Sequence, residues 1–255
     1  MPLKVLVIQS AGFIGKSTVT ASLLYPRLGE DVEVLSIEDA NEDAGEIGIP
    51  VRRFLGSEFG AVNQRVKLAS GSVIVDCGSS EYPSFIQGFA ALPGSINAFH
   101  AVVVTMTPNE RAQREAGSTI ETLKSVGLKM DRLRILFNQV DVSRLGIKIE
   151  RAVESQFVDF LTYADVNGVK VSTDAALLYA KVHMELASMN LSLSKMLADE
   201  TDYEALLDQA VLQSRSHTEA LPLVRMHHLQ LSARGVQANM DAAFKALRLP
   251  VLETV

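Results

Sequence analysis

Residues 5–18 read Val-Leu-Val-Ile-Gln-Ser-Ala-Gly-Phe-Ile-Gly-Lys-Ser-Thr: an apolar run, a turn of mostly small residues, and the start of a helical pattern. A buried strand that leads into a turn at a helix N-terminus brings backbone N–H groups together around an anion. In such a turn Lys16 would reach the β- and γ-phosphates of a nucleotide, and the Ser17 hydroxyl would hold Mg²⁺. The stretch therefore predicts a strand, a phosphate-binding turn and a helix.

The match to the general pattern G-x-x-x-x-G-K-[ST] is incomplete, because its first glycine falls on Ser10. Gly12 can still take the backbone angles of an anion-binding nest. The alternative is an ordinary strand–turn–helix connection in which the glycines only make room for packing. On the phosphate-binding interpretation, nucleotide contacts are expected from Ser10, Ala11, Gly12, Phe13, Ile14, Gly15, Lys16, Ser17 and Thr18.

The chain has 255 residues, 47% of them hydrophobic, which is enough for one large α/β domain. We expect a single domain over 1–255, with a nucleotide-binding core over about 1–180 and a helical region over about 181–255. The net charge of −6, without a long block of like charge, does not by itself indicate nucleic-acid or membrane binding. Cys77 is the one cysteine, so a disulfide framework within the chain is excluded and a buried free thiol is expected.

No stretch reaches the roughly twenty apolar residues of a membrane span, and the N-terminal apolar run is too short for a signal peptide. The sequence therefore predicts a cytoplasmic protein without a membrane span.

Further strands are predicted at residues 32–37, 72–76, 101–105 and 134–138, with helices between them, such as 109–126. This alternation predicts a doubly wound, mostly parallel sheet. A last strand is expected at 168–172, followed by Thr173-Asp174 as a helix N-cap. From residue 175 to 249 the pattern is helical, with Pro222 as a breaker and Gly235 as a turn.

Polar residues follow several of these strands, at the edge where such sheets bind ligands. Asp76 is the candidate Mg²⁺ contact, with an Asx turn or helix cap as the alternative. Asp39, which lies next to Glu38, is the preferred catalytic carboxylate, and Lys16 is the other expected catalytic residue. The acidic run from 38 to 46 is equally compatible with a solvated loop. Asn138 could read a purine edge, with adenine favoured over guanine.

The order of these motifs resembles the ParA/MinD family of deviant Walker A ATPases. The residues that carry it are Lys4-Val5-Leu6-Val7-Ile8, Gly12-Phe13-Ile14-Gly15-Lys16-Ser17-Thr18, Val73-Ile74-Val75-Asp76 and Ile135-Leu136-Phe137-Asn138. Within that family the chain is similar to the StbB plasmid stability proteins, over residues 3 to about 180. The resemblance implies P-loop NTPase topology, with ATP and Mg²⁺ bound in a nucleotide-dependent homodimer. It also implies a switch for plasmid stability, segregation and conjugative transfer, with other plasmid-encoded stability proteins bound to DNA as partners.

The chain departs from the family pattern K-G-G-x-G-K-[ST] at two positions. The first lysine, which in the family reaches the partner's phosphates, falls on Ala11, and a glycine is replaced by Phe13. Because a missing cation in the transition state slows phosphoryl transfer strongly, we expect slow or partner-dependent ATP hydrolysis. Basic residues near the C-terminus are scattered among acids, so protein partners are favoured over direct DNA binding.

Two other functions remain open at this point. One is a P-loop kinase for a small molecule or nucleotide, although no arginine-rich lid segment is evident. The other is a structural adaptor with a degenerate nucleotide site and no turnover.

Overall fold

The computed structural model describes residues 2–29, 31–39, 48–143, 147–213 and 216–250. Its strands are β1 (Lys4–Ile8), β2 (Val32–Ile37), β3 (Arg52–Phe54), β4 (Ser72–Cys77), β5 (Ala101–Met106), β6 (Leu133–Val140) and β7 (Ala176–Leu178). Its α-helices are α1 (Lys16–Thr18), α2 (Phe59–Leu68), α3 (Tyr82–Ala91), α4 (Glu110–Ser125), α5 (Ile149–Gln156), α6 (Val158–Val166), α7 (Val182–Ala187), α8 (Leu193–Leu197), α9 (Tyr203–Leu212) and α10 (His217–Ala246). A π-helical segment, η1 (Val19–Leu24), continues α1.

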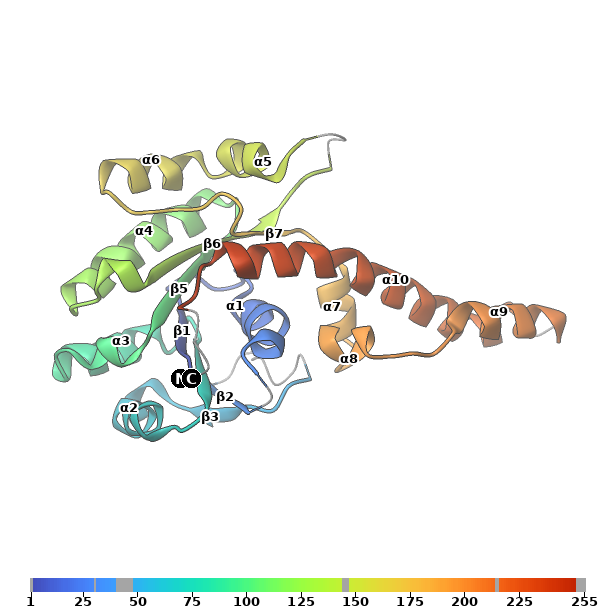
Figure 1. The fold of residues 1–255 in the computed structure, drawn as a ribbon, viewed down its shortest axis with the longest axis horizontal. Helices are drawn as coiled ribbons and strands as arrows, with labels where there is room; N and C mark the ends of the chain where they lie inside the picture. The colour runs from blue at the N-terminus through green and yellow to red at the C-terminus, as the bar shows by residue number, and fades with distance from the viewer. Residues whose placement is uncertain (1, 30, 40–47, 144–146, 214–215, 251–255) are drawn as a thin grey trace.

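The described strands form one seven-stranded sheet in the order β3-β2-β4-β1-β5-β6-β7, and every neighbouring pair is parallel (Figure 1). β1, which precedes the glycine-rich turn, lies in the centre between β4 and β5. The predicted α/β class with a doubly wound sheet is confirmed. Strands predicted at 32–37, 72–76, 101–105 and 134–138 are confirmed to within a few residues at their ends.

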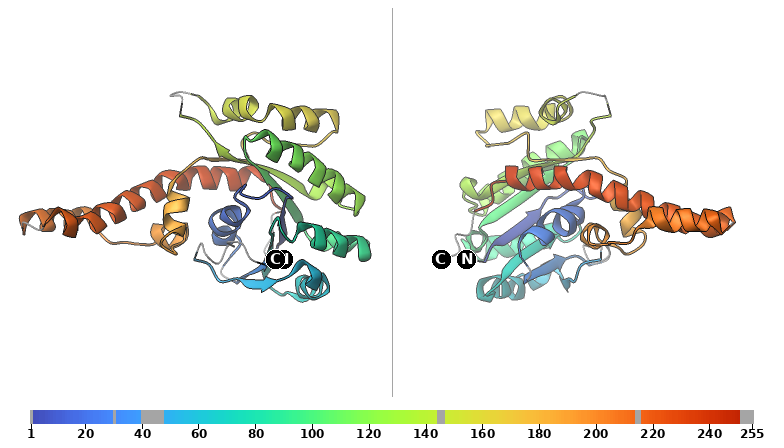
Figure 2. Two further views of the ribbon diagram at one scale, coloured as in Figure 1. Left: turned by 180° about the vertical axis from the view of Figure 1, so that it is seen from behind. Right: turned by 45° about the vertical axis from the view of Figure 1, so that its right-hand side comes forward.

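Alternate side chains of the strands enter two separate cores, one on each face of the sheet. Helices α2 to α6 cover one face and contribute large aromatic side chains, such as Phe85, Phe89 and Phe160. The other face is covered by η1, α7, α8 and α10, whose packing residues include Leu23, Leu229 and Met240. Figures 1 and 2 show these two helical layers, and show α9 and the first half of α10 projecting beyond the sheet as an arm.

The structure has no strand at residues 168–172, and Thr173-Asp174 lie in a turn before β7 rather than at the start of a helix, so both predictions are wrong. Strand β7 comes later and has only three residues, too few for an apolar pattern to reveal. It is held by α10: Asn239 Nδ2 donates to the Ala176 carbonyl at 2.9 Å, and Asn239 Oδ1 accepts from the Leu178 N–H at 2.9 Å. A side-chain amide thus takes the place of a neighbouring strand.

The breaks predicted at Pro222 and Gly235 are also wrong, because α10 runs without interruption from His217 to Ala246. Pro222 lies in the second turn, where the carbonyl that loses its partner is close to the helix start and can be hydrated. Gly235 costs about 1 kcal/mol relative to alanine. That cost is offset by the buried face of α10, which packs against the sheet.

Candidate functional site

The turn from Gln9 to Gly15 connects the end of β1 to α1 at the carboxyl edge of the sheet. Gly15 has φ +81°, in the left-handed region, and a Cβ placed there would clash with Asn138 Nδ2. Both the backbone angle and the available space therefore require glycine at this position. The turn bends sharply into the helix, as the predicted phosphate-binding turn requires.

Asn138 ties this turn to β6. Its Nδ2 donates to the Ile14 carbonyl at 2.8 Å, and its Oδ1 accepts from the Gln139 N–H at 2.9 Å. The side chain is buried, so these bonds are well protected from water. The amide thus holds the turn in place, and the predicted reading of a purine edge by Asn138 stays a prediction.

Lys16 is the central cation of the site. It is only 7% exposed, and its Nζ donates to the Ala11 carbonyl at 2.7 Å, across the turn. Burial lowers the pKa of the Lys16 ammonium below its ordinary value of 10.5, while the charges of Asp76 and Glu38 act in the opposite direction. Because a buried charge is costly unless it is compensated, an anionic ligand beside this ammonium would be bound favourably.

Asp76 lies at the end of β4, in register with Val7 of β1 and Ser36 of β2. It is buried at 3% exposure, and its negative charge acts on Lys16. A carboxylate beside the phosphate-binding lysine is a donor type that Mg²⁺ accepts directly or through water. The structure therefore brings together the predicted cation and the predicted metal-binding acid.

The two carboxylates after β2 are placed differently. Glu38 is buried, its Oε1 accepts from Ser80 Oγ at 2.5 Å, and its charge acts on Lys16. The Gly78 Cα lies against the Glu38 carboxylate, since a Cβ there would overlap Oε2. Asp39 is exposed. Its catalytic role stays a prediction, and residues 40–46 of the acidic run lie outside the described residues.

Other predicted contacts line the turn itself. Ser10 donates from its N–H to Thr119 Oγ1 at 3.3 Å, and the Gly12 Cα lies near Ser79. Phe13 is fully exposed and has φ +56°, an angle that a bulky residue rarely adopts. Ser17 and Thr18 follow Lys16 in α1 and are half-buried.

Three residues that shape the site were not predicted from the sequence. Gln9 accepts from the Ala11 N–H through its Oε1, and its Nε2 donates to the Ala112 carbonyl of α4 at 3.0 Å. Ser80 positions Glu38, and Glu115 of α4 accepts from Ser10 Oγ at 3.5 Å. Only Ser80, which follows Asp76 closely in sequence, could have been suspected. Gln9 and Glu115 are brought in by the packing of α4.

Cys77 is buried and free, as expected, and burial raises the pKa of its thiol. A buried protonated thiol packs as a small apolar group.

No protein-family model matches the sequence, and no curated protein matches it either. Solved structures do match. McdA from Cyanothece aligns with a TM-score of 0.56 at 12% identity, covering 77% of this chain and 93% of McdA. The fold is that of McdA and MinD. The MinD cell division protein of Aquifex aeolicus aligns with a TM-score of 0.51 at 12% identity, covering 92% of this chain and 97% of MinD.

The McdA and MinD structures carry the P-loop NTPase fold, and this chain reproduces it with an all-parallel sheet and helices on both faces. At 12% identity the likeness concerns the fold. Among the helices of the described residues, none has both the length and the hydropathy that crossing a membrane requires.

Proposed function

We propose that this chain binds ATP with Mg²⁺ in the turn of residues 10–18 and acts as a nucleotide-dependent switch. The observation that carries the proposal is the buried Lys16 ammonium, which reaches across a turn with a left-handed glycine, next to Asp76. The N–H groups of this turn suit phosphate oxygens. Lys16 would neutralise the β- and γ-phosphates, and Ser17 with Asp76 would hold Mg²⁺, which supplies charge neutralisation at the phosphates.

The comparisons support this proposal at the level of fold. One matching structure is a complex of a Cyanothece McdA variant with ATP, with a TM-score of 0.50 at 11% identity, covering 94% of this chain and 96% of McdA. A complex of MinC with MinD from Aquifex aeolicus also matches, with a TM-score of 0.51. A nucleotide and a protein partner are thus compatible with this architecture.

The finer proposal is a homodimer that forms with bound ATP in the cytoplasm, as in the deviant Walker A ATPases, with StbB-like work in plasmid stability, segregation and conjugative transfer. Its partners would be plasmid-encoded stability proteins bound to DNA. Hydrolysis would be slow or partner-dependent, because Ala11, at the position of the family's first lysine, offers no cation to a neighbouring nucleotide.

Molecular mass measured by light scattering, with and without Mg²⁺ and a non-hydrolysable ATP analogue, tests this function. The proposal predicts a monomer alone and a dimer with the analogue, and Lys16→Ala should abolish the change. A matched control is Lys124→Ala, which removes a half-buried lysine of α4 that pairs with Glu121. A monomer under both conditions would contradict the dimeric switch. If the chain also binds no nucleotide, the structural adaptor becomes the better interpretation.

The catalytic carboxylate is tested separately, by comparing Asp39→Asn with Glu38→Gln in single-turnover ATP hydrolysis. We propose Asp39 as the catalytic group, and its variant should then hydrolyse at least tenfold more slowly. If only Glu38→Gln slows hydrolysis, the catalytic role belongs to Glu38, the buried carboxylate whose charge acts on Lys16.

A further inference from the structure

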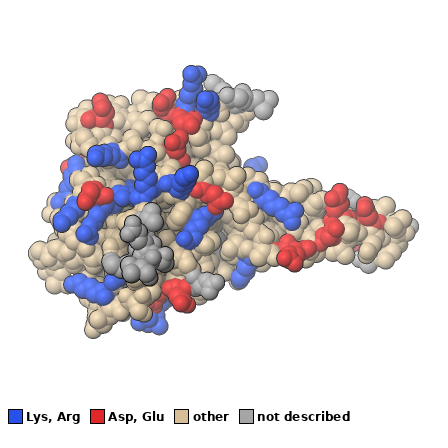
Figure 3. All heavy atoms as spheres, in the orientation of Figure 1, with Lys and Arg blue, Asp and Glu red and all other residues tan. Residues whose placement is uncertain are grey.

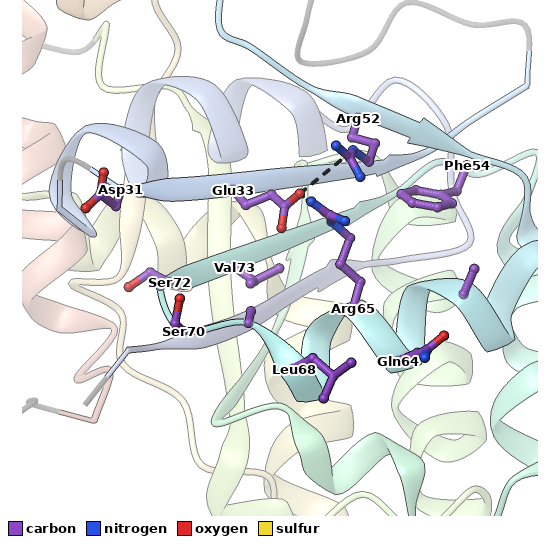
Figure 4. Close-up of a pocket in the computed structure, with 13 residues that line it drawn as sticks. Asp31, Glu33, Arg52, Phe54, Gln64, Arg65, Leu68, Ser70, Ser72 and Val73 are labelled. Atoms are coloured by element: carbon purple, nitrogen blue, oxygen red, sulfur yellow. Dashed lines mark hydrogen bonds and ion pairs between the residues drawn. The ribbon is translucent and has the colours of Figure 1, made fainter.

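A groove lies on the α2 face of the sheet at its β3 edge, between the start of β2, β3, α2, the loop 69–71 and the start of β4 (Figure 4). We call it the α2–β3 groove; its main lining residues are Glu33, Arg52, Phe54, Arg65, Leu68 and Val73. Its volume of about 730 Å³ is in the range of small-molecule sites. Glu33 and Val73 pair near the starts of β2 and β4, whereas the phosphate-binding turn lies at the opposite ends of these parallel strands.

Two guanidinium groups meet a single carboxylate in this groove. Arg65 Nε lies 2.5 Å from Glu33 Oε1, while Arg52 Nε lies 3.9 Å from the same oxygen, beyond hydrogen-bond distance. Figure 4 shows the guanidinium groups of both arginines beside the Glu33 carboxylate, with Arg52 coming from β3 and Arg65 from α2. The cluster of three thus carries one excess positive charge, and Arg52 keeps donor capacity for a second anionic group.

The cluster is open to solvent. The side chains of Arg52, Arg65 and Glu33 are 54%, 38% and 30% exposed. An exposed ion pair contributes little to folding, so stability alone is a weak reason for two arginines around one glutamate. A ligand that brings its own carboxylate or phosphate would use both guanidinium forks.

The wall beside the arginines is apolar. Leu68 at the end of α2 is 75% exposed, and it lines the groove together with Phe54 and Val73. An exposed leucine next to cations suits a ligand with an apolar part and an anionic end.

We propose that the α2–β3 groove is a second binding site, which takes an amphipathic anion: a carboxylate or phosphate held by Arg52 and Arg65, with an apolar group against Leu68 and Phe54. Glu33 acts as the internal counter-ion that the ligand's anionic group competes with. This assignment is independent of the proposed nucleotide function.

The test is an NMR titration of the ¹⁵N-labelled protein with phenyl phosphate and with phenylacetate. Inorganic phosphate and benzyl alcohol serve as probes that each carry only half of the proposed ligand. We expect saturable shifts at residues 52, 65 and 68 with at least one complete probe, and at least tenfold weaker binding of each half-probe. The titration is repeated in Lys16→Ala, so that phosphate binding at the turn of residues 10–18 is separated from binding in the groove.

Variants distinguish a binding site from a structural ion pair. Arg65→Gln should weaken binding at least tenfold, and Arg52→Gln, at a more exposed position, gives the same test if Arg65→Gln does not fold. Glu33→Gln should tighten binding at least threefold, because the internal competitor is removed. Lys124→Gln and Glu121→Gln remove one ion-paired cation and one ion-paired carboxylate of α4 and should leave the affinity unchanged. No saturable shift in the groove with either complete probe, equal binding of benzyl alcohol, or weaker binding by Glu33→Gln would overturn the proposal.

Discussion

The sheet with its flanking helices and the C-terminal arm differ in how their surfaces are used. Both faces of the sheet are covered by helices, and every residue of the central strands β1, β4 and β5 except Lys4 is buried. In contrast, the arm formed by α9 and the first half of α10 projects beyond the sheet and exposes Val211, Leu212 and Leu221. Figure 3 shows basic side chains interspersed with acidic ones on the body of the molecule, whereas the charged side chains visible on the outer part of the arm are acidic. The difference indicates that most of the folding stability comes from the sheet and the helices packed on it.

The largest expected effect on stability comes from a cavity in the core beside the sheet. Phe85 is fully buried and packs edge-to-face on Phe59 and Phe89, with ring centroids 5.2 Å apart in each pair. Phe85→Ala should lower the free energy of unfolding by about 3–5 kcal/mol. Leu212→Ala, in the arm at 84% exposure, should change it by less than about 0.5 kcal/mol. Denaturant unfolding of both variants measures these changes. Similar losses of unfolding free energy in the two variants would contradict the difference between the sheet and the arm.

A smaller, pH-dependent effect is expected from His183 in α7, where the C-terminal helices meet the sheet. Burial lowers the pKa of His183 from 6.5 to about 4. The unfolded chain therefore takes up the proton first as the pH falls, and stability is lost between pH 6.5 and 4. Allowing for partial exposure, we expect a loss of about 2 kcal/mol over this window.

His183→Gln should flatten this part of the pH profile of unfolding, since the variant has no imidazole to protonate. Hydrogen exchange then shows where the acid sensitivity resides. Loss of protection in α7 and α8 alone would mean that the C-terminal helices open separately from the sheet. An unchanged pH profile in the variant would exclude His183 as the source.

The smallest effect concerns strain at the phosphate-binding turn. Phe13 has φ +56° with a fully exposed ring, so its packing compensates none of the strain. Phe13→Gly should raise the free energy of unfolding by about 1 kcal/mol, measured by thermal or denaturant unfolding. Gln139→Gly, also at positive φ, is the matched control outside the turn. A decrease for Phe13→Gly would show that the ring contributes contacts to the folded state.

The sheet could be predicted from sequence because each central strand is a continuous apolar run, buried on both faces. The same signal fails for β3 and β7, which have three residues each and depend on tertiary contacts, such as those of Asn239. The helix breaks expected at Pro222 and Gly235 are absent for a related reason. Packing of the buried face of α10 stabilises the helix by more than these two residues destabilise it locally.

The site was predictable where it is local in sequence. Gly15, Lys16 and Asp76 follow strands in a recognisable order, and the structure brings Lys16 and Asp76 together. Gln9 and Glu115 could not be found, because their contacts exist only once α4 packs beside the turn. The amide of Asn138 was expected to face a ligand, and the structure shows it bonded to the turn.

Calorimetric titration of Mg²⁺-ATP into the wild-type chain and into Lys16→Ala, with Lys124→Ala as control, tests the central claim most directly. The account predicts binding by wild type and Lys124→Ala, and at least 100-fold weaker binding by Lys16→Ala, because the buried ammonium is the cation placed within the turn. Folding of each variant is confirmed by its unfolding midpoint. Equal affinity in all three proteins, or no binding by the wild type at millimolar ATP, would contradict a nucleotide site in the turn of residues 10–18.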